Sequence, residues 1–228
     1  MIRQGWESDS GIEELLAMTQ NAFGQIEFLT AEVNISVHGR NVNGNASAAI
    51  VYKRTDKMRI DVMGPLFKHV LSAVVNDDSM AIVTSSESWH GTISEGLIRY
   101  LPVLDLGEYD LRYALFGIVA PWKTDEKVTL SHSRADRAIV TVAQDVGERK
   151  IWVDLHRGFV FREEVITSTG LYWQRDFFGH RKILLPGPDD MLKIYLPKSV
   201  RITRPHSVLD IKFEEAFLSG GEFSANLF

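Results

Sequence analysis

Residues 57–75 read KMRIDVMGPLFKHVLSAVV, and they contain the clearest pattern in the chain. Before the Gly64-Pro65 pair, apolar Met58, Ile60 and Val62 alternate with charged residues, which predicts a half-buried β-strand. A sharp turn at residues 64–67 separates this strand from a second apolar one. A strand, a tight turn and another strand predict an antiparallel hairpin.

The same alternation continues on both sides of this hairpin. Apolar and polar residues alternate from Leu29 to Val37, and strand patterns resume after residue 126 with short turns between them. In near-continuous hairpin order these segments predict one antiparallel meander of roughly eleven strands, wrapped into an open half-barrel. The predicted fold class is therefore mainly β, and no linker divides residues 1–228, so we expect a single domain.

Two helical regions interrupt the β pattern. Ser10 and Glu13 have the spacing of a capping box, which predicts that a helix over residues 10–24 begins there. Residues 94–118 hold two more helical segments, and Ser94 is the residue expected to cap the first of them. Lying across an antiparallel sheet, these segments would form a helical lid.

Composition excludes several classes of partner and site. The chain has 228 residues, a formal net charge of −5 and no cysteine. A negative net charge disfavours nucleic acid, which rewards clustered Lys and Arg. The absence of cysteine excludes disulfides and thiolate metal ligands in this sequence. No apolar run reaches the length of a membrane-spanning helix.

The sequence contains none of four common catalytic or cofactor-binding motifs. The chain has no nucleophile elbow, phosphate-binding loop, zinc-protease helix or dinucleotide fingerprint. Its seven histidines are scattered singly, and Glu163 and Glu164, as neighbours in a strand, point to opposite faces. We therefore expect a protein that is not an enzyme and that uses no metal and no cofactor.

The alternating residues and the lid together predict an apolar cavity. We expect Ile35, Val37, Ile60 and Val62 to face the concave side of the sheet. Four leucines of the lid would cover this side: Leu97, Leu101, Leu111 and Leu115. A period of two does not separate a ligand cavity from a core filled by its own side chains, so both interpretations stay open.

Leu66 and Phe67 occupy a turn, where polar residues are more usual. Because Gly64 and Pro65 favour a tight, pre-set turn, we expect Leu66 and Phe67 to project into solvent at the rim. Exposed apolar side chains at such a tip are typical of contact with a membrane or a partner. The alternative is that both side chains fold back onto the core.

Residues 59–66 and the segment Leu111-Arg112-Tyr113-Ala114-Leu115-Phe116-Gly117 resemble motifs of the LolB family of bacterial outer-membrane lipoprotein receptors. The resemblance covers residues 11–143. The first motif is similar to the family's N-P-L-G turn. The second is similar to its L-x-x-W-x-x-G helix end, with Ala114 in place of the tryptophan. Phe67 also departs from the family, which has glycine there.

The resemblance implies an open β-barrel with a helical plug and a cavity that accepts acyl chains of lipids or lipoproteins. It also implies a periplasmic lipoprotein carrier as a partner and contact with the outer-membrane surface, with Leu66 in the position of the family's exposed leucine. The expected location is the periplasmic face of the bacterial outer membrane, reached through an N-terminal lipidated cysteine that this sequence lacks. Two alternatives remain: a cell-envelope structural or interaction protein with a self-filled cavity, and a hydrolase.

Overall fold

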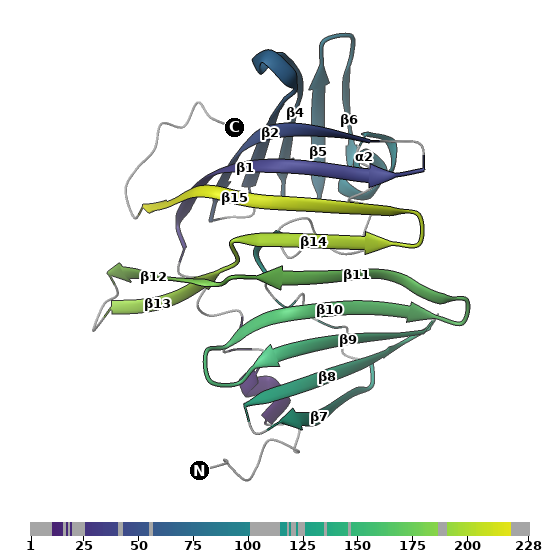
Figure 1. The fold of residues 1–228 in the computed structure, drawn as a ribbon, viewed down its shortest axis with the longest axis vertical. Helices are drawn as coiled ribbons and strands as arrows, with labels where there is room; N and C mark the ends of the chain where they lie inside the picture. Colours follow the sequence, from purple (N-terminus) through teal and green to yellow (C-terminus); the bar gives the residue numbers. More distant parts are fainter. Residues whose placement is uncertain are drawn as a thin grey trace. The chain divides into compact units, whose positions relative to one another are not determined.

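The computed structural model shows a mainly β protein (Figure 1). It describes residues 11–15, 17, 19, 26–40, 43–54, 57–100, 115–117, 119, 122, 126–134, 136–145, 147–186 and 191–219. Contacts divide the chain into two compact units. Unit 1 comprises residues 1–23 and 112–205, and unit 2 comprises residues 24–111 and 206–228.

Unit 2 is built from seven neighbouring strands. In spatial order these are β6 (Ser88–Thr92), β5 (Ser79–Thr84), β4 (His69–Asn76), β3 (Lys57–Met63), β2 (Asn43–Lys53), β1 (Phe28–Gly39) and β15 (Ser207–Ser219). Neighbouring strands of this run pair antiparallel. Short hairpins join β1 to β6 in chain order, as the periodicity predicted.

Unit 1 has a similar run of six strands. In spatial order these are β14 (Ser199–Arg204), β11 (Gly170–Phe178), β10 (Phe159–Thr167), β9 (Gly147–Asp154), β8 (Arg137–Gln144) and β7 (Val128–Arg134). Together the two runs make one open antiparallel sheet of 13 strands. A separate two-stranded ribbon, β12 (Arg181–Pro186) with β13 (Met191–Leu196), leaves the sheet between β11 and β14 in the chain.

The estimate of eleven strands is therefore too low. Short segments also pair, because each one can join a hairpin neighbour: β6 pairs with β5, and β12 pairs with β13 outside the main sheet. The sheet is open, and its end strands are β6 and β7.

The core of each unit lies on one face of its strands. In unit 1, the register places buried Val140, Ile151 and Glu163 side by side across β8, β9 and β10. The alternate residues, such as Trp152, face the other way and are partly exposed. We call this second side the outer face of unit 1.

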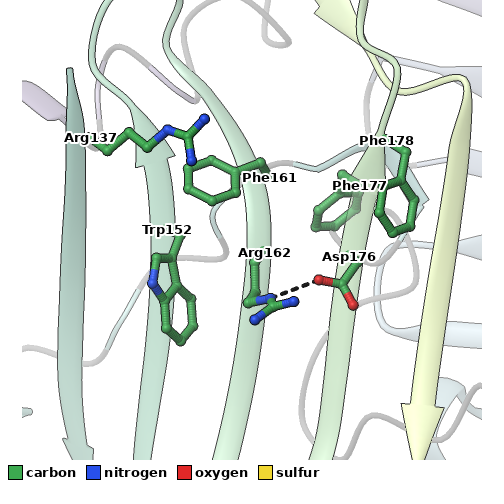
Figure 2. Close-up of a pocket in the computed structure, with 7 residues that line it drawn as sticks. All are labelled: Arg137, Trp152, Phe161, Arg162, Asp176, Phe177 and Phe178. Atoms are coloured by element: carbon green, nitrogen blue, oxygen red, sulfur yellow. Dashed lines mark hydrogen bonds and ion pairs between the residues drawn. The ribbon is translucent and has the colours of Figure 1, made fainter. Parts of the chain in front are cut away.

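A β-bulge in β10 changes which residues reach that outer face. Val160 lies opposite Val153, and Arg162 lies opposite Trp152, so Phe161 is an extra residue in β10. Such a bulge re-aims side chains. Figure 2 shows the result, with Phe161 and Arg162 on the same stretch of strand beside Trp152.

Helices are few. Residues 11–15, 17 and 19 are helical, and Ile12, Leu15 and Thr19 are buried, as the amphipathic pattern of the predicted N-terminal helix requires. Helix α2 spans Ile93–Tyr100 in unit 2. Within the described residues, no helix combines the length and the apolar character needed to cross a membrane.

Candidate functional site

One face of unit 2 is apolar, and it contains the four sheet residues predicted for the cavity. Ile60 lies opposite Ile50 of β2, and Val62 lies opposite Ala48. On β1, Ile35 and Val37 follow Val33, the partner of Ala48, at intervals of two residues. Residues two apart share a face of a strand, so all four predicted residues point to the same side of the sheet.

Burial changes along this apolar face. At one end Leu29, Met58, Val75 and Met80 are at most 1% exposed. At the other end, next to the hairpin turns, Ile35, Val37 and Val62 are only half-buried. The described residues therefore leave part of the apolar face accessible, and this accessible part is the candidate functional site.

Helix α2 packs against β5 and β6, at the edge of the same unit. Gly96 permits the close approach, because a Cβ at this position would lie 2.6 Å from Met80 Sδ and 2.7 Å from a ring carbon of Trp89. Leu97 is 1% exposed. The expected cap, Ser94, is not the one observed: Thr92 Oγ1 accepts from the Glu95 backbone N–H, and Glu95 Oε2 accepts from the Thr92 backbone N–H.

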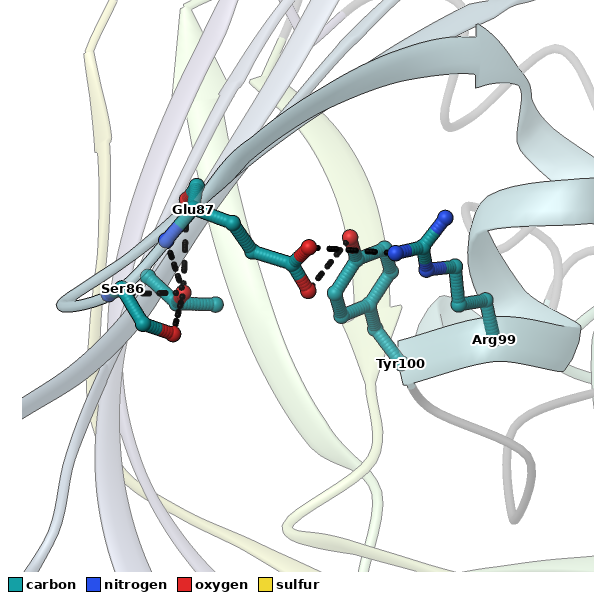
Figure 3. A network of polar contacts seen from close by, with 5 residues as sticks. Ser86, Glu87, Arg99 and Tyr100 are labelled. Atoms are coloured by element: carbon teal, nitrogen blue, oxygen red, sulfur yellow. Dashed lines mark hydrogen bonds and ion pairs between the residues drawn. The ribbon is translucent and has the colours of Figure 1, made fainter.

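A polar network ties the end of α2 to the turn between β5 and β6 (Figure 3). Arg99 Nη2 donates to Glu87 Oε2 at 3.1 Å, and the Tyr100 hydroxyl donates to Glu87 Oε1 at 3.0 Å. The backbone N–H of Glu87 donates to Thr84 Oγ1, which fixes the turn itself. Apolar packing at Gly96 and hydrogen bonds from Arg99 and Tyr100 thus both hold α2 against β5 and β6.

The lid differs from the prediction. Leu97 belongs to α2 in unit 2, whereas Leu115 is buried in unit 1 and lies in a helical turn with Phe116. The two leucines therefore belong to different compact units. Leu101 and Leu111 lie outside the described residues.

The turn after β3 exposes Leu66, as predicted. A 3-10 turn at Pro65–Phe67 places this side chain at 97% exposure. Gly64 is extended, and the left-handed residue of the turn is Leu66, with φ 59° and ψ 30°. A leucine in this left-handed region costs about 1–2 kcal/mol relative to the usual helical region. The side chain of Phe67 lies outside the described part of the structure.

A hydrogen-bonded network that sequence reasoning missed lies beside this turn. The carboxylate of Asp61 accepts from Arg59 at 2.8 Å and from Ser72 Oγ at 2.5 Å, and Ser72 Oγ also contacts His69 Nε2 at 2.9 Å. Partial burial would raise the pKa of Asp61, but the hydrogen bonds from Arg59 and Ser72 outweigh it and lower the pKa. The network joins β3 to β4, the two strands that precede and follow the exposed Leu66 in the chain.

Unit 1 holds a buried ion cluster that was also missed. Glu163 accepts from Arg149 Nε at 2.5 Å and forms a second ion pair with Arg175, and each of the three residues is about 1% exposed or less. Burial alone would raise the pKa of Glu163, but the charges of Arg149 and Arg175 hold it below its usual range. Arg175 also lies over the ring of Trp173, 4.8 Å from its centroid.

The prediction that Glu163 and Glu164 face opposite sides is confirmed, because Glu163 is buried while Glu164 is partly exposed on the outer face. Within the described ranges, no cluster of three or more His, Asp or Glu side chains has the arrangement of a metal site.

Comparisons with known proteins agree on the fold. No protein-family model and no curated protein matches the sequence. A solved LolA superfamily protein from Nitrosomonas europaea has a TM-score of 0.62 and 12% identity, over 92% of this chain and 94% of that chain. A DUF1329 family protein from Desulfovibrio piger has a TM-score of 0.64 and 13% identity, over 93% and 95%.

A third solved structure, described as an outer-membrane lipoprotein-sorting domain from Vibrio parahaemolyticus, has a TM-score of 0.62 and 8% identity, over 92% of this chain and 94% of that chain. At such low identity the similarity establishes the fold alone. It extends over nearly the whole length of the chain in each case. This chain therefore has the LolA/LolB-like fold that its sequence motifs indicated.

Proposed function

We propose that this chain is a non-enzymatic binding protein that holds the acyl chain of a lipid or lipoprotein on the apolar face of unit 2. One observation carries the proposal: the apolar face is fully buried at one end and only half-buried at Ile35, Val37 and Val62. An acyl chain packed against these residues would bury them, and the hydrophobic effect that stabilises the core would also stabilise this contact. Each methylene buried contributes about 0.8 kcal/mol.

The rest of the predicted cavity belongs to this proposal. Leu97 of α2 is proposed to contact the acyl chain within unit 2, and Leu101, Leu111 and Leu115 stay predicted ligand contacts. The similar structures support the proposal through their fold, since one of them is described as a lipoprotein-sorting domain. A bacterial cell-envelope location, at the periplasmic face of the outer membrane with a lipoprotein carrier as partner, follows from it.

A cell-envelope structural or interaction protein with a self-filled cavity is the second candidate. The observation that favours it is the depth of burial in the same unit, where Ile60 of the apolar face is 6% exposed and Leu97 of α2 is 1% exposed. If side chains alone fill the interior, acyl chains have no volume to enter. A binding measurement therefore separates the two candidates.

Saturable binding of cis-parinaric acid, followed by its fluorescence, should be weakened by Val62→Glu. A carboxylate at this half-buried position would have to be desolvated when the acyl chain covers it, so we expect a loss of about tenfold or more. The matched control is Val83→Glu, because Val83 is 50% exposed on the opposite face of unit 2 and should leave binding unchanged.

Ile35→Glu is a second test position in case Val62→Glu lowers the stability, which thermal melting of each variant would show. Absence of saturable binding by the wild-type chain would favour the self-filled interior. Equal losses in Val62→Glu and Val83→Glu would mean that the fatty acid binds elsewhere. Either result would reject the apolar face as the binding site.

The exposed leucine has a separate role in this proposal, which is contact with the membrane or with a lipoprotein partner. Leu66 is held at 97% exposure in a left-handed conformation, between the ends of β3 and β4. Exposing a large apolar side chain on a strained backbone has no benefit for the folded chain in water. It is favourable where the tip enters an apolar environment, since burying a leucine contributes about 1.5–3 kcal/mol.

Leu66→Asn should lower association with phosphatidylethanolamine–phosphatidylglycerol liposomes by about tenfold, as the loss of one buried leucine predicts. Stability should stay the same or rise by up to about 1 kcal/mol, because asparagine tolerates the left-handed region better than leucine. Co-sedimentation and urea unfolding measure the two effects. Ile98→Asn is the control, since Ile98 is 57% exposed on α2 and should not alter liposome binding. A destabilised Leu66→Asn would instead show that this side chain supports the fold.

A further inference from the structure

Unit 1 has a hollow of about 430 Å³ that the proposed acyl-binding function does not use. Seven residues of four adjacent strands line it: Arg137, Trp152, Phe161, Arg162, Asp176, Phe177 and Phe178 (Figure 2). Its volume lies within the range of sites for small molecules, about 300–1,000 Å³.

The hollow lies on the outer face of unit 1, away from the buried core. Trp152 alternates with buried Ile151 and Val153, and Arg137 precedes Ala138, which is 0% exposed. Neighbouring residues of a strand point to opposite faces, so Trp152 and Arg137 point away from the core. The hollow is therefore built from residues of unit 1 alone, on its outer face.

Three partly exposed aromatic side chains form the apolar part of the hollow. Trp152 is half-buried on β9, and Phe178, at the end of β11, is 47% exposed. Phe161 is the extra residue of the β10 bulge, which brings its ring next to Arg137. Aromatic rings that stay partly exposed offer flat surfaces on which another ring can stack.

The polar part of the hollow is cationic. Arg162 Nε donates to Asp176 Oδ1 at 2.7 Å, and Gln174 donates to Asp176 Oδ2 at 2.6 Å, so both oxygens of this carboxylate are already engaged. The guanidinium of Arg137 lies 4.8 Å from the Phe161 ring centroid. Among the residues that the structure describes, Arg137 has no carboxylate partner.

Two guanidinium groups thus flank the rings, and one acid, Asp176, lies among the residues that line the hollow. Glu164, two residues beyond Arg162 on the outer face, also interacts with Arg162. The ion pair of Arg162 with Asp176 uses Nε, and the Arg162 guanidinium carbon lies 5.9 Å from the centroid of the Trp152 ring. Guanidinium groups bind phosphate and carboxylate oxygens through paired N–H donors. Arg137 is the guanidinium without a carboxylate partner among the described residues, so the hollow favours an anion.

We propose that this hollow binds a small organic anion in which a phosphate or carboxylate group is attached to a flat ring. Arg137 and the terminal nitrogens of Arg162 hold the oxyanion. Trp152 and Phe161 cover the ring. Asp176 fixes Arg162 and repels a second acidic group, which limits the ligand to one anionic end.

The probes are 1-naphthyl phosphate and 1-naphthoate, with neutral 1-naphthol and inorganic phosphate as partial ligands, titrated by isothermal calorimetry. Arg137→Gln should weaken both naphthyl anions about tenfold or more, as expected when a charge-assisted hydrogen bond is lost. Phe161→Ala should weaken them while having little effect on inorganic phosphate. Lys182→Gln removes one exposed positive charge from the same unit and should change nothing.

Arg137 is exposed and has no ion pair in the described residues, so Arg137→Gln should melt at the wild-type temperature. Equal affinities of Arg137→Gln and the wild-type chain would overturn the proposal, as would naphthol binding as tightly as the anions. Failure of all probes to bind would also overturn it, and the acyl-binding proposal would be unaffected because it concerns unit 2. Stronger binding by the phosphate ester than by 1-naphthoate would identify phosphate as the preferred anion.

Discussion

Glu163→Gln should lower the free energy of unfolding by about 3–5 kcal/mol, the usual cost of removing one partner from a buried ion pair. The two arginines that contact Glu163 are each at most 1% exposed, so they would remain charged in an apolar interior without their shared acid. Urea unfolding at pH 7, followed by tryptophan fluorescence, measures the loss.

The adjacent residue provides a matched control for this substitution. Glu164 lies on the outer face and is partly exposed; its pKa is raised, mainly by desolvation, so its charged form is not stabilised by the fold. Glu164→Gln should therefore change stability by no more than about 0.5 kcal/mol. Glu163→Asp, which keeps the charge but shortens the side chain, should fall between the two. Similar stabilities for Glu163→Gln and Glu164→Gln would show that the ion cluster contributes little.

The arrangement of strands could be predicted because alternation is a local signal. The run from Leu29 to Val37 indicated β1, and the residues predicted to share its apolar face do share it. The exposure of Leu66 was also predictable, since Pro65 shapes the turn locally. The sequence did not predict which residue of the turn is left-handed, because the chain could reverse direction with either Gly64 or Leu66 in that conformation.

The buried ion cluster shows where alternation stops being informative. Arg149 lies two residues from Ile151 in β9, so alternation places it on the buried face of that strand. Arg175 lies two residues from both Trp173 and Phe177 in β11, and alternation likewise predicts that it is buried. Two buried arginines can be explained only when an acid that pairs with both of them is identified. The acid, Glu163, is identified by the pairing of β10 with β9 and β11, which no single strand encodes.

The outer-face hollow was not predictable for a related reason. The bulge at Phe161 reverses the alternation of β10, so that Val160 is buried and Arg162, two residues later, faces outward. A strict period of two would place both residues on one face. Sites that depend on a bulge and on cross-strand register therefore need the assembled sheet.

Stability should also fall between pH 7 and pH 5 because of His180, before Glu163 takes up a proton. His180 is stacked on Phe159 with ring centroids 3.7 Å apart, and its Nε2 is 3.1 Å from the carbonyl oxygen of Val160. Desolvation lowers the pKa of His180 from 6.5 to about 4. Phe159 also lies against Tyr195 of β13, so this cluster connects the ribbon to β10.

The sign of the effect follows from the direction of the shift. Since the folded state takes up the proton less readily than the unfolded state, the neutral form of His180 is the stabilised one. Its contribution is complete above pH 6.5 and is lost as the pH falls from 6.5 towards about 4. The expected loss between pH 7 and pH 5 is about 2 kcal/mol.

Urea unfolding of the wild-type chain and His180→Gln at pH 7, 6 and 5 measures this loss. Glutamine can still donate a hydrogen bond to Val160 but does not titrate, so the variant should lose most of the pH dependence in this window. His156→Gln, at an exposed turn of the same unit, should keep the full wild-type dependence. If His180→Gln retains the wild-type slope, the proton is taken up elsewhere. In that case protonation of His180 does not cause the pH dependence of stability.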